Sequence, residues 1–419
     1  MNGPSNWRQT RRRKPLFPPQ PSPKTGQRVR NKGPQNVDHL TGNGIIRIRR
    51  RVYWYRDEGR DGRLDHWLGI ADRNVSVAAR ELCCRVGTTG VSFAKAVENL
   101  SRLGNIRIGR EWLREIVQSE GRAVVASRED RTLGPNWEAK DCAVDEGGPT
   151  RVMVGSDGVM VPVITEAEKQ KRRENLAKKR AGKRIRRRKS GRRRQRGSDQ
   201  AYKEFKIGTF YDESRQRQYA FGTSGNHEVL GRMLRREAGK LKLSQAQEKI
   251  SVSDGAKWIR HQLEVQLPML DAMILDFYHF AEHVAGAART CFGEGTAATG
   301  SWMEQVLEAA RTQGPAAVLV KIQETRKPIR SAGKRAALQS LLQYVTGRCE
   351  MLDYPMFRAK GWDIGSGVTE AFCKTLTTRL KGCGMRWNVR NAEAMMALAA
   401  LEHSNLWDPY WQQQKRRAA

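Results

Sequence analysis

The stretch KISVSDGAKWIR, residues 249–260, changes character at an acidic residue. Its first half is apolar, which predicts a buried strand that ends at Asp254 and Gly255. The residues after Gly255 predict a helix. A buried strand that ends in an acid and leads into a helix is typical of an α/β sheet with polar side chains along one edge.

Two further segments repeat this arrangement. TRVMVGSDG, residues 150–158, predicts a buried strand with Asp157 at its tip. AMILDFYHFAEH, residues 272–283, predicts a strand ending at Asp276 and a helix that carries His279. If the first two strands are neighbours in one sheet, their carboxyl ends bring Asp157 and Asp254 together.

The rest of the central chain completes a mixed α/β sheet. Residues 203–212 and 217–225 predict two strands joined by a polar turn, with a helix after them that ends near residue 243. Residues 284–360 carry a helical pattern without a strand signal, so we expect an all-helical insertion there. GSGVTEAFCKTLTTRLKGCGMRW, residues 365–387, starts a helix that carries Glu370, and a helix packed across the sheet edge would add this third acid.

Three clustered carboxylates predict a metal site. Like charges a few ångströms apart repel, so such a cluster needs cations between its members. Oxygen ligands select hard ions, so we expect two Mg²⁺ or Mn²⁺ ions bound by Asp157, Asp254 and Glu370, with Asp276 as a fourth candidate ligand. The alternative is that each aspartate before glycine is a turn residue or a helix cap, and that Asp276 caps the helix after it.

The charge balance predicts a polyanionic partner. Lys and Arg number 77 against 44 Asp and Glu, a net charge of +33. The chain has no run of 18 apolar residues and no apolar signal segment at its start, so we expect a soluble, cytoplasmic, nucleoid-associated protein that binds double-stranded DNA and no membrane. Its seven cysteines form no CxxC pair, which predicts neither a zinc site nor disulfides.

One segment concentrates this charge. Residues 169–196 contain 17 Lys or Arg and a single acid, Glu174, and we expect this basic insertion (169–197) to bind DNA phosphates without reading sequence. A solvated basic face and an RNA-binding or ribosome-associated role are the alternatives. The candidate DNA-binding residues here are Arg186, Arg187, Arg188, Arg192 and Arg193.

Further candidate DNA contacts flank the acids. Lys374, Arg379, Lys381 and Arg386 follow Glu370, and Lys257 follows Asp254. Trp258 and Trp387 are candidates for stacking on splayed bases, with core packing as the alternative.

The N-terminal third predicts a separate DNA-binding region. Residues 1–40 are basic and proline-rich, which predicts a disordered arm, and residues 45–57 predict a strand with one basic face. Three helical segments follow, with Ser76 and Ser92 as N-caps and Gly104 and Gly121 as helix ends. They fit a helix-turn-helix whose last helix presents Arg110 and Arg114 to a major groove, or a plain helical bundle without DNA contact.

The motifs VGSDGV, SVSDGAKWI, ILDFYHFAEH and GSGVTEAFCKTLTTRLKGCGMRW together resemble the DDE transposases of bacterial insertion sequences, most closely the ISKra-type group, over about residues 45–405. The resemblance implies an RNase H-like core with catalytic Asp157, Asp254 and Glu370, interrupted by a helical insertion and preceded by a helix-turn-helix. Asp276 and His279 fall where such enzymes have a C/D-x-x-H signature, so His279 would contact the DNA near the scissile phosphate or pack as a structural histidine.

The resemblance implies a transposase that binds the terminal inverted repeats of its element and catalyses strand cleavage and strand transfer as a homo-oligomer. The alternative is an inactive or domesticated DNA-binding protein of the same descent. The expected domains are an arm (1–40), a helix-turn-helix region (41–125), a core (126–283 and 361–405) interrupted by a helical insertion (284–360), and a basic tail (406–419).

Overall fold

The computed structural model describes residues 26, 30–55, 59–60, 74–182 and 201–418. The chain divides into two compact units, one made of residues 1–117 and 408–419 and the other of residues 118–407. Most of the predicted arm and the second half of the predicted basic insertion lie outside the described residues.

The smaller unit combines a three-stranded antiparallel sheet of order β1-β2-β3 with short helices. Its elements are β1 (Arg30–Thr41), β2 (Gly44–Tyr55), β3 (Gly59–Arg60), α2 (Val77–Thr89), α3 (Phe93–Leu103), the start of α4 (Arg110–Glu129) and α15 (Trp407–Ala418). Ser76 and Ser92 cap α2 and α3 through their side chains, as predicted, and Gly104 ends α3.

Two predictions about the chain ends are wrong. Residues 30–40 are not a disordered arm, because their backbone pairs with β2 along almost its whole length and Leu40 is buried. The segment 406–419 is not a tail, because Trp407, Tyr410 and Trp411 bury their rings and form one face of α15. Composition alone hides both elements, since polar residues surround the few apolar ones that fix them.

Helix α4 is longer than the sequence predicted. Leu113, Ile116 and Val117 are buried, as expected, while the helix continues through Gly121 to Glu129. A Cβ on Gly121 would collide with the backbone of Ala394 in α14 (Val389–His403). The glycine therefore serves close helix packing rather than helix termination.

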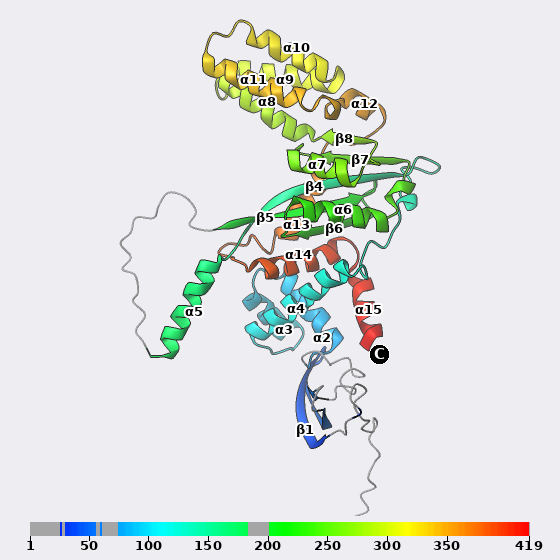
Figure 1. Ribbon diagram of the computed structural model, residues 1–419, viewed down its shortest axis with the longest axis vertical. Coiled ribbons are helices and arrows are strands. Elements are labelled where there is room, and N and C mark those ends of the chain that lie inside the picture. The colour runs from blue at the N-terminus through cyan, green and yellow to red at the C-terminus, as the bar shows by residue number, and fades with distance from the viewer. Residues whose placement is uncertain (1–25, 27–29, 56–58, 61–73, 183–200, 419) are drawn as a thin grey trace, which may run out of the picture. The chain divides into compact units, whose positions relative to one another are not determined.

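The larger unit is built on a mixed five-stranded sheet of order β6-β5-β4-β7-β8 (Figure 1). Strands β4, β7 and β8 are parallel, and β5 pairs antiparallel with both β4 and β6. The strands are β4 (Arg151–Pro162), β5 (Tyr202–Tyr211), β6 (Gln218–Thr223), β7 (Glu248–Ser253) and β8 (Ala272–Leu275). The mixed α/β sheet expected from the sequence is present.

Helices cover both faces of this sheet. Thr209 of β5 bonds to Thr369 of α13 (Gly367–Thr377), while the preceding residue, Gly208, lies against Leu234 of α6 (His227–Lys240). Because successive residues of a strand point to opposite faces, α13 and α6 lie on opposite sides. Helix α14 shares the α13 side, and α7 (Lys257–Gln266) packs beside α6.

The segment after β8 is helical throughout, as predicted for residues 284–360. It contains α8 (Phe277–Phe292), α9 (Ala297–Thr312), α10 (Pro315–Arg326), α11 (Ala332–Thr346), a short 3₁₀ turn (Cys349–Met351) and α12 (Tyr354–Ala359). Two other 3₁₀ turns lie earlier in the chain, at Ala139–Asp141 and Leu243–Gln245. Figure 1 shows α8 to α11 gathered beyond the β8 edge of the sheet. Their buried residues form one hydrophobic core with β7 and β8.

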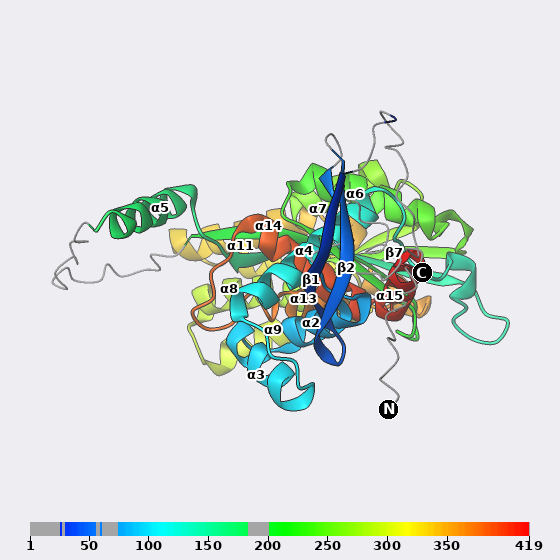
Figure 2. The same cartoon turned by 90° about the horizontal axis from the view of Figure 1, so that it is seen from below.

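Helix α5 (Glu166–Arg180) leads out of β4 and holds the described part of the basic insertion. It buries no residue, and Figures 1 and 2 show it standing apart from the sheet. Thr165 and Glu168 form a capping box at its start. Glu168 also pairs with Arg386 at 2.5 Å, which ties the root of the basic helix to the segment after α13.

Candidate functional site

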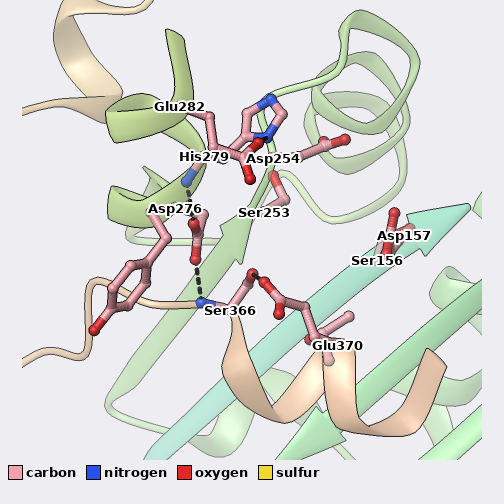
Figure 3. A pocket seen from close by; sticks show the side chains of 11 residues that line it. Ser156, Asp157, Ser253, Asp254, Asp276, His279, Glu282, Ser366 and Glu370 are labelled. Carbon is pink, nitrogen blue, oxygen red and sulfur yellow. Dashed lines mark hydrogen bonds and ion pairs between the residues drawn. The ribbon is translucent and has the colours of Figure 1, made fainter. Parts of the chain in front are cut away.

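A cavity of about 360 Å³ opens where β4, β7, α8 and α13 meet (Figure 3). Its lining is polar and includes the three acids predicted as catalytic, together with Asp276 and His279. The lining residues are Ser156, Asp157, Ser253, Asp254, Asp276, Tyr278, His279, Glu282, Ser366, Thr369 and Glu370.

The sheet register explains why the aspartates meet. The last parallel pair of β4 and β7 is Gly155 with Val252, and the last pair of β7 and β8 is Ser253 with Leu275. Extending both ladders places Asp157, Asp254 and Asp276 at the same level across three strands. The sequence predicted Asp157 at the tip of its strand, and this is wrong. Strand β4 continues to Pro162, and beyond Gly155 it pairs, among the described strands, with β5 alone. From Asp157 onward, the edge of β4 that faces β7 has no described strand paired to it, and the cavity lies there.

Asp157 lies in an unfavourable setting for a charge. Burial raises its pKa above the ordinary value, and the nearby charges of Asp254 and Glu370 add to this rise. Hydrogen bonds from the Gly158 amide, at 2.6 Å, and from the Cys373 thiol act in the opposite direction. The acids are therefore close enough to influence one another.

Asp254 sits in the tight turn between β7 and α7. Its carboxylate accepts the Ala256 amide at 2.8 Å, which is the turn role considered as the alternative for such an aspartate. Gly255 has a φ of +69°, a backbone conformation that glycine adopts without strain. Arg348 from the helical segment donates to the Gly255 carbonyl at 2.9 and 3.2 Å and so holds this turn in place.

Glu370 reaches the cavity from the first turn of α13. Its side chain is exposed and accepts a hydrogen bond from the Ser366 hydroxyl at 3.1 Å. Asp276 is 2 % exposed and caps α8 by accepting the His279 amide at 2.6 Å, so the capping role considered in the sequence is present. Its other oxygen accepts the Ser366 amide, and Figure 3 shows the three bonds in succession from His279 through Asp276 and Ser366 to Glu370.

His279 faces the cavity rim beside a second histidine. Its Nδ1 lies 3.6 Å from the Glu282 carboxylate, and its ring meets that of His283 edge to face at 5.0 Å. His283 in turn stacks on Tyr344 at 3.9 Å, and burial lowers the His283 pKa. His279 is thus partly packed and partly accessible to the cavity.

The donors around the cavity suit hard cations. Carboxylate and hydroxyl oxygens dominate the lining, and such ligands fit Mg²⁺ or Mn²⁺. No group of three or more His, Cys, Asp or Glu side chains within the described ranges is already arranged to hold a metal ion. The types of side chain around the cavity therefore fit these ions. Their positions do not form a complete metal site.

Four of the predicted DNA contacts are engaged inside the protein. Trp387 is buried and donates to the Leu380 carbonyl, and Arg379 lies over its ring at 5.4 Å. Arg386 pairs with Glu168. Trp258 receives the Lys206 ammonium over its ring at 4.4 Å, on the sheet face away from α13. Core and interface packing, the alternative weighed for both tryptophans, describes them better than base stacking.

The remaining predicted contacts are mostly accessible. Lys374, Lys381 and Lys257 are exposed, the first two on the α13 side of the cavity. Arg110 and Arg114 are exposed in the first turns of α4 and pair with Glu111. The predicted contacts Arg186, Arg187, Arg188, Arg192 and Arg193 lie outside the described residues.

Sequence reasoning missed six residues of the lining, namely Ser156, Ser253, Tyr278, Glu282, Ser366 and Thr369. Ser366 lies one helical turn before Glu370, and this i, i+4 spacing could have identified it. Glu282 lies one turn after His279, at the i, i+3 spacing. Tyr278, 73 % exposed at the rim, was visible only as one aromatic residue among several.

Comparisons with known proteins find similarity among solved structures but none by family or curated sequence. No protein-family model matches the chain, and no curated protein matches it. Among solved structures it is similar to the Drosophila P element transposase strand transfer complex, with 12% sequence identity, a TM-score of 0.28, and 84% of each chain covered. A similarity at this TM-score does not establish a shared fold. Within the described residues no helix is both long and apolar enough to cross a membrane.

Proposed function

We propose that this protein is a DDE-type transposase that binds the ends of its own mobile element and cuts and joins DNA strands with divalent metal ions. One observation carries the proposal: Asp157, Asp254 and Glu370, about a hundred residues apart in sequence, line a single polar cavity. The resemblance of their motifs to ISKra-type transposases points to the same three residues.

Each part of the site has a role in this proposal. Asp157, Asp254 and Glu370 would hold two Mg²⁺ or Mn²⁺ ions. Such an ion pair activates the attacking water or 3′-OH and stabilises the leaving oxygen. Lys374 and Lys381, exposed on the helix and loop after Glu370, would hold the DNA phosphates beside the acids. The basic insertion would bind further along the duplex without reading its sequence.

Substitution of the acids tests the proposal. Asp157→Asn, Asp254→Asn and Glu370→Gln keep the side-chain shapes and remove the charges. In a Mg²⁺ assay on a duplex copied from the DNA that flanks the reading frame, we expect each variant to lose strand cleavage by at least about 10³-fold, while duplex binding is retained or strengthened. Cleavage at the parent rate in all three variants would exclude the proposed site.

A second function is favoured by one observation. Among the described residues, the three acids are not arranged as a formed metal site. This arrangement would suit an inactive DNA-binding protein of the same descent. That protein would bind the flanking duplex with the same salt dependence and would show no cleavage in Mg²⁺ or Mn²⁺. The same assay therefore separates the two functions.

A further inference from the structure

Asp276 is a buried carboxylate that bonds to two backbone amides. It is 2 % exposed, its Oδ1 accepts the His279 amide at 2.6 Å, and its Oδ2 accepts the Ser366 amide at 2.5 Å. These amides belong to the start of α8 and the start of α13, and Asp276 and Ser366 are ninety residues apart in the chain. Asp276 therefore fastens the beginning of α13 to the sheet edge where the other aspartates lie.

Ser366 is the N-cap residue of α13, yet its hydroxyl does not cap that helix. The hydroxyl donates to Oε1 of Glu370 at 3.1 Å, and only 8 % of the residue is exposed. A capping serine normally accepts an amide of its own first turn. In this helix that bond is given up, and the hydroxyl is directed at the carboxylate instead.

A hydrogen-bond partner would fix the orientation of the Glu370 side chain. Its long side chain is exposed, and its charge lies near that of Asp157. Repulsion would turn it away from the cavity. A hydrogen bond to a charged group is stronger than one between neutral groups, so the Ser366 hydroxyl favours the rotamer that it contacts.

We propose that Asp276 and Ser366 form a positioning relay, in which Asp276 fixes Ser366 and Ser366 holds the Glu370 carboxylate toward the cavity. Asp276 then acts as an anchor and not as a fourth metal ligand. This inference rests on the proposed function, because it assumes that Glu370 takes part in binding the ions. Residues that orient ligands in this way typically change metal affinity by about 10- to 100-fold when removed.

The test measures Mn²⁺ binding to the full-length protein by electron paramagnetic resonance, without DNA and without turnover. Ser366→Ala removes the hydroxyl and keeps the amide that Asp276 accepts. We expect Mn²⁺ affinity to fall about 10- to 100-fold in Ser366→Ala and to recover in Ser366→Thr, which restores a hydroxyl. Ser331→Ala is a matched control, because Ser331 is also an N-cap without a side-chain cap bond, and it is exposed on α11. This control should bind Mn²⁺ like the parent.

Three companion variants, Glu370→Gln, Asp157→Asn and Asp276→Asn, distinguish a failure of the relay from a failure of the proposed function. Parent-like affinity in Ser366→Ala, together with weakened binding in Glu370→Gln, would overturn the relay and leave the proposed function standing. Parent-like affinity in both Glu370→Gln and Asp157→Asn would overturn the proposed function itself. Strong loss in Asp276→Asn with none in Ser366→Ala would make Asp276 a ligand and refute its anchoring role. Thermal melting identifies a poorly folded Ser366→Ala, in which case Ser366→Cys, a weak donor, replaces it.

Discussion

The charge of Asp157 lowers the folding stability of the protein. Its pKa is raised, first by burial and then by the charges of Asp254 and Glu370, so its charged form is less stable in the folded chain than in the unfolded one. A raised carboxyl pKa means that the folded state binds the proton more tightly. Folding stability therefore falls as the pH rises from the ordinary aspartate value, about 3.9, through the folded value.

Asp157→Asn should remove this loss. In metal-free buffer we expect the variant to melt at a higher temperature than the parent at pH 7.5, with the difference shrinking as the pH approaches about 4. Added Mn²⁺ should raise the melting temperature of the parent and leave that of Asp157→Asn unchanged. Asp145→Asn, at an exposed site, is the control and should change neither value. A variant less stable than the parent at pH 7.5 would mean that the Asp157 charge is stabilised by the fold.

The sequence predicted which acids lie together better than it predicted the partners of single side chains. Asp157, Asp254 and Glu370 line one cavity because strand register and helix packing place them there, and the pattern of strands and helices in the sequence indicates both. The roles of Trp258, Trp387 and Arg386 depend on which side chain lies opposite, namely Lys206, the Leu380 carbonyl and Glu168. Such long-range partners leave no local pattern, so ring or charge type alone suggested DNA contact.

At the scale of elements, the position of Glu370 depends on how closely α13 approaches β4. A Cβ on Gly155 would collide with the hydroxyls of Thr369 and Thr209, which are bonded to each other at 3.1 Å between the helix and the sheet. We expect Gly155→Ala to lower the free energy of unfolding by about 1–3 kcal/mol, because the buried contact cannot expand without moving the helix. Urea unfolding measures this change.

A second glycine serves as the control for that prediction. Gly300 lies in α9 with open space where its Cβ would be, so Gly300→Ala should stabilise the protein by about 0.5–1 kcal/mol. Stability equal to the parent in Gly155→Ala would show that α13 does not need to approach β4 so closely. The displaced helix should also weaken Mn²⁺ binding, since it carries Glu370 and Ser366.

Element boundaries were predictable where one local signal decides them. The serine caps of α2 and α3 and the order of strands and helices through the core follow from local composition. The length of β4, the passage of α4 through Gly121, and the pairing of residues 30–40 with β2 depend on distant partners. A sequence read locally stops each of these elements too early or omits it, because the stabilising neighbour is far away in the chain.

At the scale of the whole molecule, charge is distributed unevenly. The net charge is +33, yet residues 169–196 alone contribute 17 basic side chains. The described part of this segment forms α5, which buries nothing and is held at its root by the Glu168–Arg386 pair. A helix without a packing role leaves its basic side chains largely exposed, while the cavity residues belong to the sheet and the helices packed on it.

Removal of residues 169–196 should therefore change how duplex binding depends on salt. Each lost phosphate contact should flatten the slope of log affinity against log salt by about 0.9, measured by fluorescence anisotropy on a duplex of arbitrary sequence between about 50 and 200 mM salt. The deletion keeps Glu168 and its partner Arg386. A variant of full length with the same Lys and Arg residues changed to Gln is the control, because it alters charge and not chain length, and it should show the same flattening. An unchanged slope in both variants would mean that this segment contacts no phosphate, and DNA binding would then have to come from the exposed lysines around the cavity.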